Sequence, residues 1–254
     1  MQRSIVETET FPQPPERLAR LDELALLDRG YIRAWDLPTR VFKWSLAVSV
    51  VVAYAATWLP DPAMTAHRLA GYFVLSLVLF RIVWGFIGSR TARFSSFLRG
   101  PRAVGRYLSG AFRGEGLRFV GHNPAGGAMI LTLLLLLALQ SGTGLFASDG
   151  VLASGPFADF LGDDASGLVT AAHRYGIYAL IAAIAIHIAA NVYYQTVKRE
   201  PLISAMITGR KPADVAYADA PAHGGAGLLM ALIVFGVCAL VVVGGVWFVA
   251  GSLV

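Results

Sequence analysis

Two histidines, His173 and His187, lie 14 residues apart in a largely apolar stretch of the chain. This stretch, residues 167–194, is long enough to cross a bilayer as a helix, since about 20 residues suffice. Because 14 residues make about four helical turns, both imidazoles leave the same face, roughly 21 Å apart along the axis. Ionisable side chains at membrane depth mark functional sites, and imidazole is a common axial ligand of haem iron. The spacing favours one helix that holds two haems, while hydrogen bonding between helices remains the alternative.

The composition is that of a membrane protein. Of the 254 residues, 56% are hydrophobic and 15% are charged, and the mean hydropathy is +0.60. The single cysteine, Cys238, excludes a disulfide within the chain, and the lack of a C-x-x-C-H sequence excludes c-type haem attachment. The net charge of +5 does not indicate nucleic-acid binding, because the arginines lie beside apolar runs. The first apolar run follows polar residues 1–40, which is unlike a cleaved signal peptide.

Five stretches are apolar and long enough to span a membrane: residues 41–58, 67–88, 124–146, 168–195 and 227–250. The segments between them alternate in charge. Residues 1–40 carry six arginines and residues 89–121 carry seven, whereas residues 59–66 and 147–167 carry no Lys or Arg. Basic segments stay in the cytoplasm, so the N-terminus is expected inside and the C-terminus outside. A helix bundle follows, because each span must satisfy its own backbone hydrogen bonds in lipid.

The remaining histidines are distributed over both ends of the predicted bundle. His67 opens the second span at the same outer end as His173, so these two can face each other across one site. His187 lies deep on the inner side, and His122 opens the third span at the inner face. His223 lies in the polar linker before the fifth span and is interpreted as a solvated loop residue.

Three arginines are placed where they could neutralise haem propionates. Arg68 and Arg174 directly follow the two outer histidines, His67 and His173. Arg81 lies 14 residues after His67, so it shares the face of that histidine and reaches inner depth. The alternative for Arg81 is an ordinary side chain that extends to the inner interface.

Several motifs follow one another between Tyr31 and Lys211: W-D-x-P-x-R-x-F-x-W at 35–44, H-R-x-x-G-Y at 67–72, R-x-x-W-G-x-x-G-S-R-x-A-R-F at 81–94 and G-H-N-P-x-G at 121–126. Together with His173 and His187 they resemble the bacterial cytochrome b561 family, which includes the cytochrome b subunits of nickel-iron hydrogenases. The resemblance implies an all-α, integral membrane four-helix bundle that binds two b-type haems, with the fifth helix as an addition. It also implies electron transfer between quinone and redox partners.

By this resemblance, His67 and His173 match the ligands of the outer haem, and His187 matches one ligand of the inner haem. The other inner ligand in the family is a histidine, but this chain has Lys43 at the matching position. Three readings stay open. Lys43 binds iron as an uncharged amine; the inner haem keeps only His187 or recruits His122; or the inner haem is absent and Lys43 is an interfacial lysine. His122 is otherwise expected to contact a ligand or a propionate. An amine ligand would change the redox potential.

The sequence therefore predicts an N-terminal cytoplasmic segment at 1–33, a cytochrome b561-like domain at 34–211, and a linker with the fifth helix at 212–254. The expected partners are quinone or quinol, membrane lipid, and a c-type cytochrome or an oxidoreductase subunit at the bacterial inner membrane. One alternative is a quinone oxidoreductase that uses superoxide or another small molecule. Another alternative is a haem-free membrane anchor or transporter. A membrane metalloprotease is disfavoured, because no H-E-x-x-H sequence occurs.

Overall fold

The computed structural model describes residues 30–59, 63–114, 117–150, 154–219 and 224–251. Most of the N-terminal segment and His223 lie outside these described residues. Five long helices dominate the described part: α2 (Leu37–Ala56), α3 (Ala63–Ile87), α6 (Pro124–Gly144), α7 (Asp163–Thr196) and α9 (Leu228–Ala250). Each is long and apolar enough to cross a membrane. The predicted all-α membrane bundle with one additional C-terminal helix is confirmed.

Three of the helices begin four or five residues earlier than their apolar stretches. The early turns contain polar residues, which a hydropathy pattern excludes although they start helices well. Asp36 caps α2 and Pro38 lies in its first turn, while Asp163 and Asp164 lie in the first turn of α7. With 34 residues, α7 is about 51 Å long, which exceeds the roughly 30 Å hydrocarbon core. It therefore extends beyond the apolar layer.

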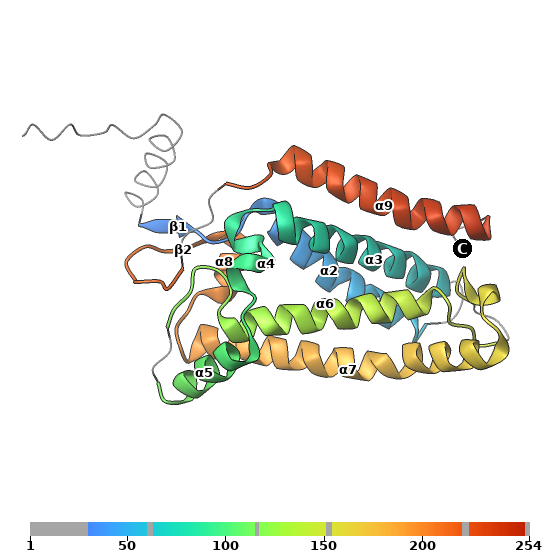
Figure 1. Cartoon of the computed structure of the whole chain (residues 1–254), viewed down its shortest axis with the longest axis horizontal. Helices are drawn as coiled ribbons and strands as arrows, with labels where there is room; N and C mark the ends of the chain where they lie inside the picture. Colours follow the sequence, from blue (N-terminus) through green and yellow to red (C-terminus); the bar gives the residue numbers. More distant parts are fainter. Residues whose placement is uncertain (1–29, 60–62, 115–116, 151–153, 220–223, 252–254) are drawn as a thin grey trace, which may run out of the picture.

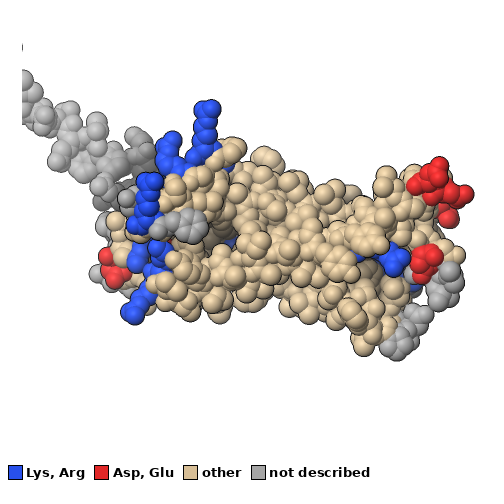
Figure 2. Space-filling view, turned by 90° about the horizontal axis from the view of Figure 1, so that it is seen from below, with Lys and Arg blue, Asp and Glu red and all other residues tan. Residues whose placement is uncertain are grey.

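The short elements gather at one end of the bundle (Figure 1). They are β1 (Tyr31–Arg33), η1 (Arg90–Ala92), α4 (Phe94–Phe97), α5 (Pro101–Phe112), α8 (Leu202–Thr208) and β2 (Arg210–Pro212). Strands β1 and β2 pair antiparallel, with Ile32 opposite Lys211. Figure 2 shows most Lys and Arg of the visible face at this end and most Asp and Glu at the opposite end, near η2 (Ala158–Phe160). We call these the basic end and the acidic end.

Helix α3 is the centre of the bundle. It packs against α2, α6 and α9, and α6 packs in turn against α7, while α7 makes no extensive contact with α2 or α3 in the described part of the chain. An apolar cluster from α3, α6 and α7 fills the middle of the bundle, formed by Val74, Val78, Leu134, Leu137 and Leu180. The cluster separates the levels of the outer and inner histidines.

Asp36, in the first sequence motif, connects the start of α2 to the end of α3. Its Oδ1 accepts a hydrogen bond from the Thr39 backbone N–H at 2.7 Å and so caps α2. Its Oδ2 accepts from Trp84 Nε1 at 3.2 Å and from the Ser89 backbone N–H at 3.3 Å. Trp84 is fully buried, so its indole N–H has no access to water. One carboxylate thus satisfies donors from two helices.

We expect Asp36→Ala to destabilise the protein by about 2–3 kcal/mol, because it removes a helix cap and leaves the buried Trp84 donor unpaired. The matched control is Asp159→Ala, which changes an exposed aspartate at the acidic end. Thermal unfolding in detergent micelles measures both. Equal midpoints for the two variants would contradict the assigned role of Asp36.

Candidate functional site

The two outer histidines face each other although their helices, α3 and α7, make no extensive contact in the described part of the chain. His67 on α3 and His173 on α7 have ring centroids 6.0 Å apart, with ring planes at 83°. A metal-bound imidazole nitrogen lies about 2 Å from the ion and the ring centre roughly 1 Å further, so two imidazoles on opposite sides of one ion have centroids roughly 6 Å apart. The spacing of this pair therefore fits one metal ion between them.

Backbone carbonyls fix both outer rings. His67 Nδ1 lies 2.8 Å from the Ala53 carbonyl oxygen of α2, and His173 Nδ1 lies 2.9 Å from the Gln140 carbonyl oxygen of α6. A carbonyl only accepts hydrogen bonds, so each Nδ1 carries a proton, and Nε2 is the nitrogen through which each ring could bind a metal. This is the usual arrangement of metal-binding histidines, whose second nitrogen donates to a carbonyl or carboxylate.

The surroundings leave little freedom for His173. A Cβ at Gly144 of α6 would lie 2.8 Å from His173 Cε1, so glycine allows the ring to rest against this helix. A Cβ at Gly71 of α3, one turn after His67, would meet nothing within 4 Å. The space beside Gly71 suits a flat group that approaches the outer pair along α3.

The two arginines next to the outer histidines differ in environment. Arg68 is half-buried, and its buried Nε has no hydrogen-bond partner among the described residues. Arg174 is exposed. Of the two, Arg68 has the donor that lacks a partner and so suits an anionic group at the outer site.

The inner histidine is held differently. His187 Nε2 lies 3.2 Å from Asn191 Nδ2, one turn further along α7, and Asn191 Nδ2 also donates to the His187 carbonyl oxygen at 2.8 Å. Nε2, which in His67 and His173 has no hydrogen bond within the described part of the chain, therefore contacts the Asn191 amide in His187. Metal binding through His187 Nε2 requires Asn191 to release it.

Lys43 lies in a cluster of groups at the inner end of α2. Its Nζ is 3.2 Å from Met206 Sδ, 3.5 Å from His122 Nε2 and 4.0 Å from the centre of the Trp35 ring. His187 lies within electrostatic range of this amine. No carboxylate within the described residues forms an ion pair with it. The predicted residues Lys43, His122 and His187 are thus brought to one region.

His122 is enclosed by aromatic rings. Its centroid is 4.6 Å from that of Trp35 and 4.9 Å from that of Phe97, and its buried Nδ1 has no partner among the described residues. Burial lowers the pKa of His122 well below its ordinary value, and the charges of Lys43 and Arg81 act in the same direction. His122 is therefore neutral at pH 7 and can accept or donate one further hydrogen bond.

Arg81 is almost fully enclosed, since only 2% of its surface is exposed. Its Nη2 donates to the Ala92 carbonyl oxygen at 3.0 Å, and its guanidinium carbon lies 4.9 Å from the Phe94 ring centre. Its buried Nη1 has no partner, and no carboxylate pairs with it in the described ranges. Arg81 does not extend to the interface. A buried cation with a free donor suits an anionic ligand group.

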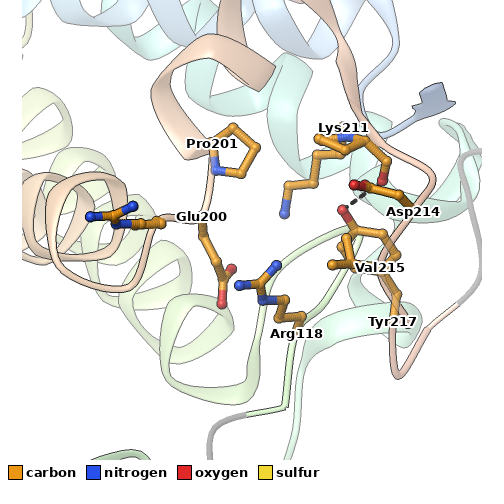
Figure 3. Close-up of a pocket in the computed structure, with 9 residues that line it drawn as sticks. Arg118, Glu200, Pro201, Lys211, Asp214, Val215 and Tyr217 are labelled. Carbon is orange, nitrogen blue, oxygen red and sulfur yellow. Dashed lines mark hydrogen bonds between the residues drawn. The ribbon is translucent and has the colours of Figure 1, made fainter. Parts of the chain in front are cut away.

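Met206 and Trp35 also belong to this region, although the sequence did not predict them as site residues. The sequence could have indicated Trp35, because this residue begins the motif at residues 35–44. No sequence pattern indicated Met206, since it lies in α8 and reaches Lys43 through the pairing of β1 with β2. The sequence also did not predict a pocket of about 210 Å³ at the basic end (Figure 3).

This pocket is lined by nine residues: Arg118, Arg199, Glu200, Pro201, Lys211, Pro212, Asp214, Val215 and Tyr217. Burial raises the pKa of Glu200 and lowers the pKa of Lys211. Lys211 Nζ donates to the Phe119 carbonyl oxygen at 2.6 Å, and Tyr217 donates to the Pro212 carbonyl oxygen at 2.9 Å. The lysine thus connects β2 to the loop before α6.

Comparison with known proteins identifies relatives over most of the chain. The family model described as prokaryotic cytochrome b561 matches residues 34–209. A Rhodobacter capsulatus protein named probable Ni/Fe-hydrogenase B-type cytochrome subunit is 25% identical over 227 residues, which cover 76% of this chain and 86% of the relative. A protein of the same name from Bradyrhizobium diazoefficiens is 26% identical over 219 residues, which cover 72% of this chain and 87% of the relative. No protein of known structure matches this chain significantly.

Proposed function

Because this chain belongs to the prokaryotic cytochrome b561 family, we propose that it carries electrons between a quinone and a redox enzyme through two b-type haems. Membership makes the chain a multi-pass membrane b-type cytochrome, so haem b and electron transport follow from the family. The haem number, the quinone, the ligands and the domain limits 34–211 belong to the proposal.

One observation carries the outer half of the proposal: the pairing of His67 with His173. Their centroid distance of 6.0 Å fits one ion between them, and their Nδ1 hydrogen bonds leave both Nε2 lone pairs available. Haem iron supplies one-electron chemistry when bound, by changing between its ferrous and ferric forms. The Ala53 and Gln140 carbonyls hold the imidazoles in one tautomer, so the ligands need little rearrangement on binding.

For the inner site we propose His187 as one ligand and Lys43 as the other. Asn191 would release His187 Nε2, and Lys43 would move from the sulfur of Met206. His122, which lies 3.5 Å from the amine, can accept the hydrogen bond of a neutral or bound Lys43. Recruitment of His122 itself, and an inner site without haem, remain the competing readings.

We further propose that the basic end faces the cytoplasm and the acidic end the periplasm. The relatives are named as hydrogenase cytochrome subunits. A hydrogenase, another oxidoreductase subunit or a c-type cytochrome is therefore the proposed partner at the acidic end, where Asp159, Asp163 and Asp164 are exposed. The quinone would bind towards the inner haem.

The test is the absorption spectrum of the purified protein, followed by a pyridine haemochrome assay per chain. We expect sharp reduced α and Soret bands, two haems, and reduction by a short-chain quinol. A colourless protein after expression with ample haem would exclude the proposal. A single haem would retain the outer site and reject the inner one.

Arg81→Gln tests the proposed contact between Arg81 and an inner haem propionate. A charge-assisted hydrogen bond contributes about 1.5–3 kcal/mol, and a tenfold change in a one-electron equilibrium corresponds to about 59 mV. Loss of a positive charge destabilises the reduced haem, so we expect the inner potential to fall by roughly 50–100 mV. A redox titration measures the shift. The control, Arg106→Gln, removes an exposed arginine of α5 and should leave both potentials unchanged.

A further inference from the structure

A second pocket at the basic end lies apart from the histidines and from the pocket in Figure 3. Its volume is about 480 Å³, and its lining residues are Arg90, Arg93, Ser95, Ser96 and Gly224. All five are cationic, hydroxylic or glycine. The pocket in Figure 3 differs, since Glu200 and Asp214 accompany its cations. An anion would therefore meet no carboxylate in the lining of this second pocket.

Two segments distant in sequence form the pocket: the turn after α3 and the linker before α9. The Ala226 backbone N–H donates to the Ile87 carbonyl oxygen at 3.1 Å, which fastens the linker to the end of α3. A Cβ at Gly225 would lie 2.5 Å from the Ser89 backbone nitrogen, and the φ angle of Gly225 is +96°. Only glycine permits this approach and this conformation. The pocket is thus a fixed feature between two helices.

Several polar groups of the pocket are available to a ligand, whereas the Ser96 hydroxyl donates to the Arg93 carbonyl oxygen at 2.7 Å. Arg93 is held in place because its Nε donates to the Gly88 carbonyl oxygen at 3.0 Å. Arg90 and Ser95 are exposed, and neither side chain has a hydrogen-bond partner among the described residues. No carboxylate of the described part forms an ion pair with Arg90 or Arg93. Two guanidinium groups beside hydroxyls suit a phosphate group, which accepts several charge-assisted hydrogen bonds.

Apolar side chains continue from the pocket along the bundle. On α3, Phe86 is 69% exposed, and its ring lies 5.5 Å from that of Phe94, the residue before Ser95. On α9, Leu228 and Leu229 are 52% and 73% exposed. Helices α3 and α9 run side by side from this end (Figure 1). A free phosphate would use only the polar pocket, whereas a phospholipid would use both surfaces.

We propose that this pocket binds the phosphate of an anionic phospholipid, whose acyl chains lie along the exposed apolar faces of α3 and α9. Basic pockets between transmembrane helices commonly recognise anionic head groups. The bound lipid would join the α3 turn to the linker and so hold α9 against the four haem-binding helices.

Binding is measured by native mass spectrometry of the delipidated, haem-containing protein titrated with dioleoylphosphatidylglycerol. We expect one tightly bound lipid in the wild type and at least tenfold weaker binding in Arg90→Glu, because the variant reverses a charge next to the phosphate. Ser95→Asp places a negative charge in the same pocket and should weaken binding similarly. The matched control is Arg106→Glu, the same charge reversal on exposed α5, which should bind within about twofold of the wild type. An unchanged haem spectrum shows that each variant is folded.

Three results would overturn the proposal. Equal weakening in Arg90→Glu and Arg106→Glu would mean that overall surface charge attracts the lipid. Wild-type binding in both pocket variants would mean that the lipid lies elsewhere. Displacement of the lipid by inorganic phosphate at similar concentration would identify a small-anion site instead.

Discussion

His173→Ala should remove one of the two proposed haems from each chain. The substitution deletes the ring that faces His67 at 6.0 Å, and no other described imidazole lies at this end of the bundle to replace it. A b-type haem is held only by its ligands and its pocket, so loss of one axial ligand should release it. We expect the pyridine haemochrome count to fall from two to one. Electron transfer to a periplasmic acceptor should fall at least 100-fold.

The control for His173→Ala is Tyr175→Ala, which shortens a side chain of the same helix that is 69% exposed. It should retain both haems and the wild-type rate. A second variant, Gln140→Ala, keeps the backbone carbonyl that fixes His173 but removes the amide that donates to the His173 carbonyl oxygen at 2.9 Å. It should retain the haem with a small spectral change. Two haems in His173→Ala would refute the outer ligand assignment.

The positions of the spans and the pairing of the outer histidines could be anticipated from periodicity and apolar length. His67 and His173 open the second and fourth spans at the same end of the bundle, so the alternation of the spans places them at one level. The starts of α2 and α7 could not be placed by hydropathy, because the cap of α2, Asp36, and the first residue of α7, Asp163, are polar. Local chemistry decides these boundaries, and the apolar pattern does not record it.

The inner region was less predictable because its contacts join segments far apart in the chain. Lys43 contacts Met206 of α8. The pairing of β1, which precedes α2, with β2, which follows α8, places these two helices near each other. No periodic pattern places α8 there. The burial of Arg81 could not be predicted either, because the same sequence also allows its side chain to extend to the membrane interface. The aromatic rings that cover Arg81 belong to Phe94 and Phe97, the first and last residues of α4.

Lys43→Ala should change the spectrum of the proposed inner haem. If the amine is the ligand, its loss leaves His187 alone on iron, and the low-spin spectrum of one haem should become high-spin. Lys43→His should restore a low-spin spectrum with a different potential. Since axial ligands set haem potentials over about 0.8 V, we expect a shift of the order of 100 mV. Magnetic circular dichroism and redox titration measure these effects.

The control for Lys43→Ala is Lys198→Ala, which removes another half-buried lysine whose Nζ donates to the Ala111 carbonyl oxygen at 3.4 Å. It should leave both haems unchanged. A low-spin inner haem in Lys43→Ala would contradict amine ligation and direct attention to the two remaining donors beside the amine, His122 and Met206. The double variants Lys43→Ala with His122→Ala and Lys43→Ala with Met206→Leu then separate them. A thioether ligand raises the potential relative to an imidazole ligand, so a haem that recruits Met206 should have a higher potential than one that recruits His122.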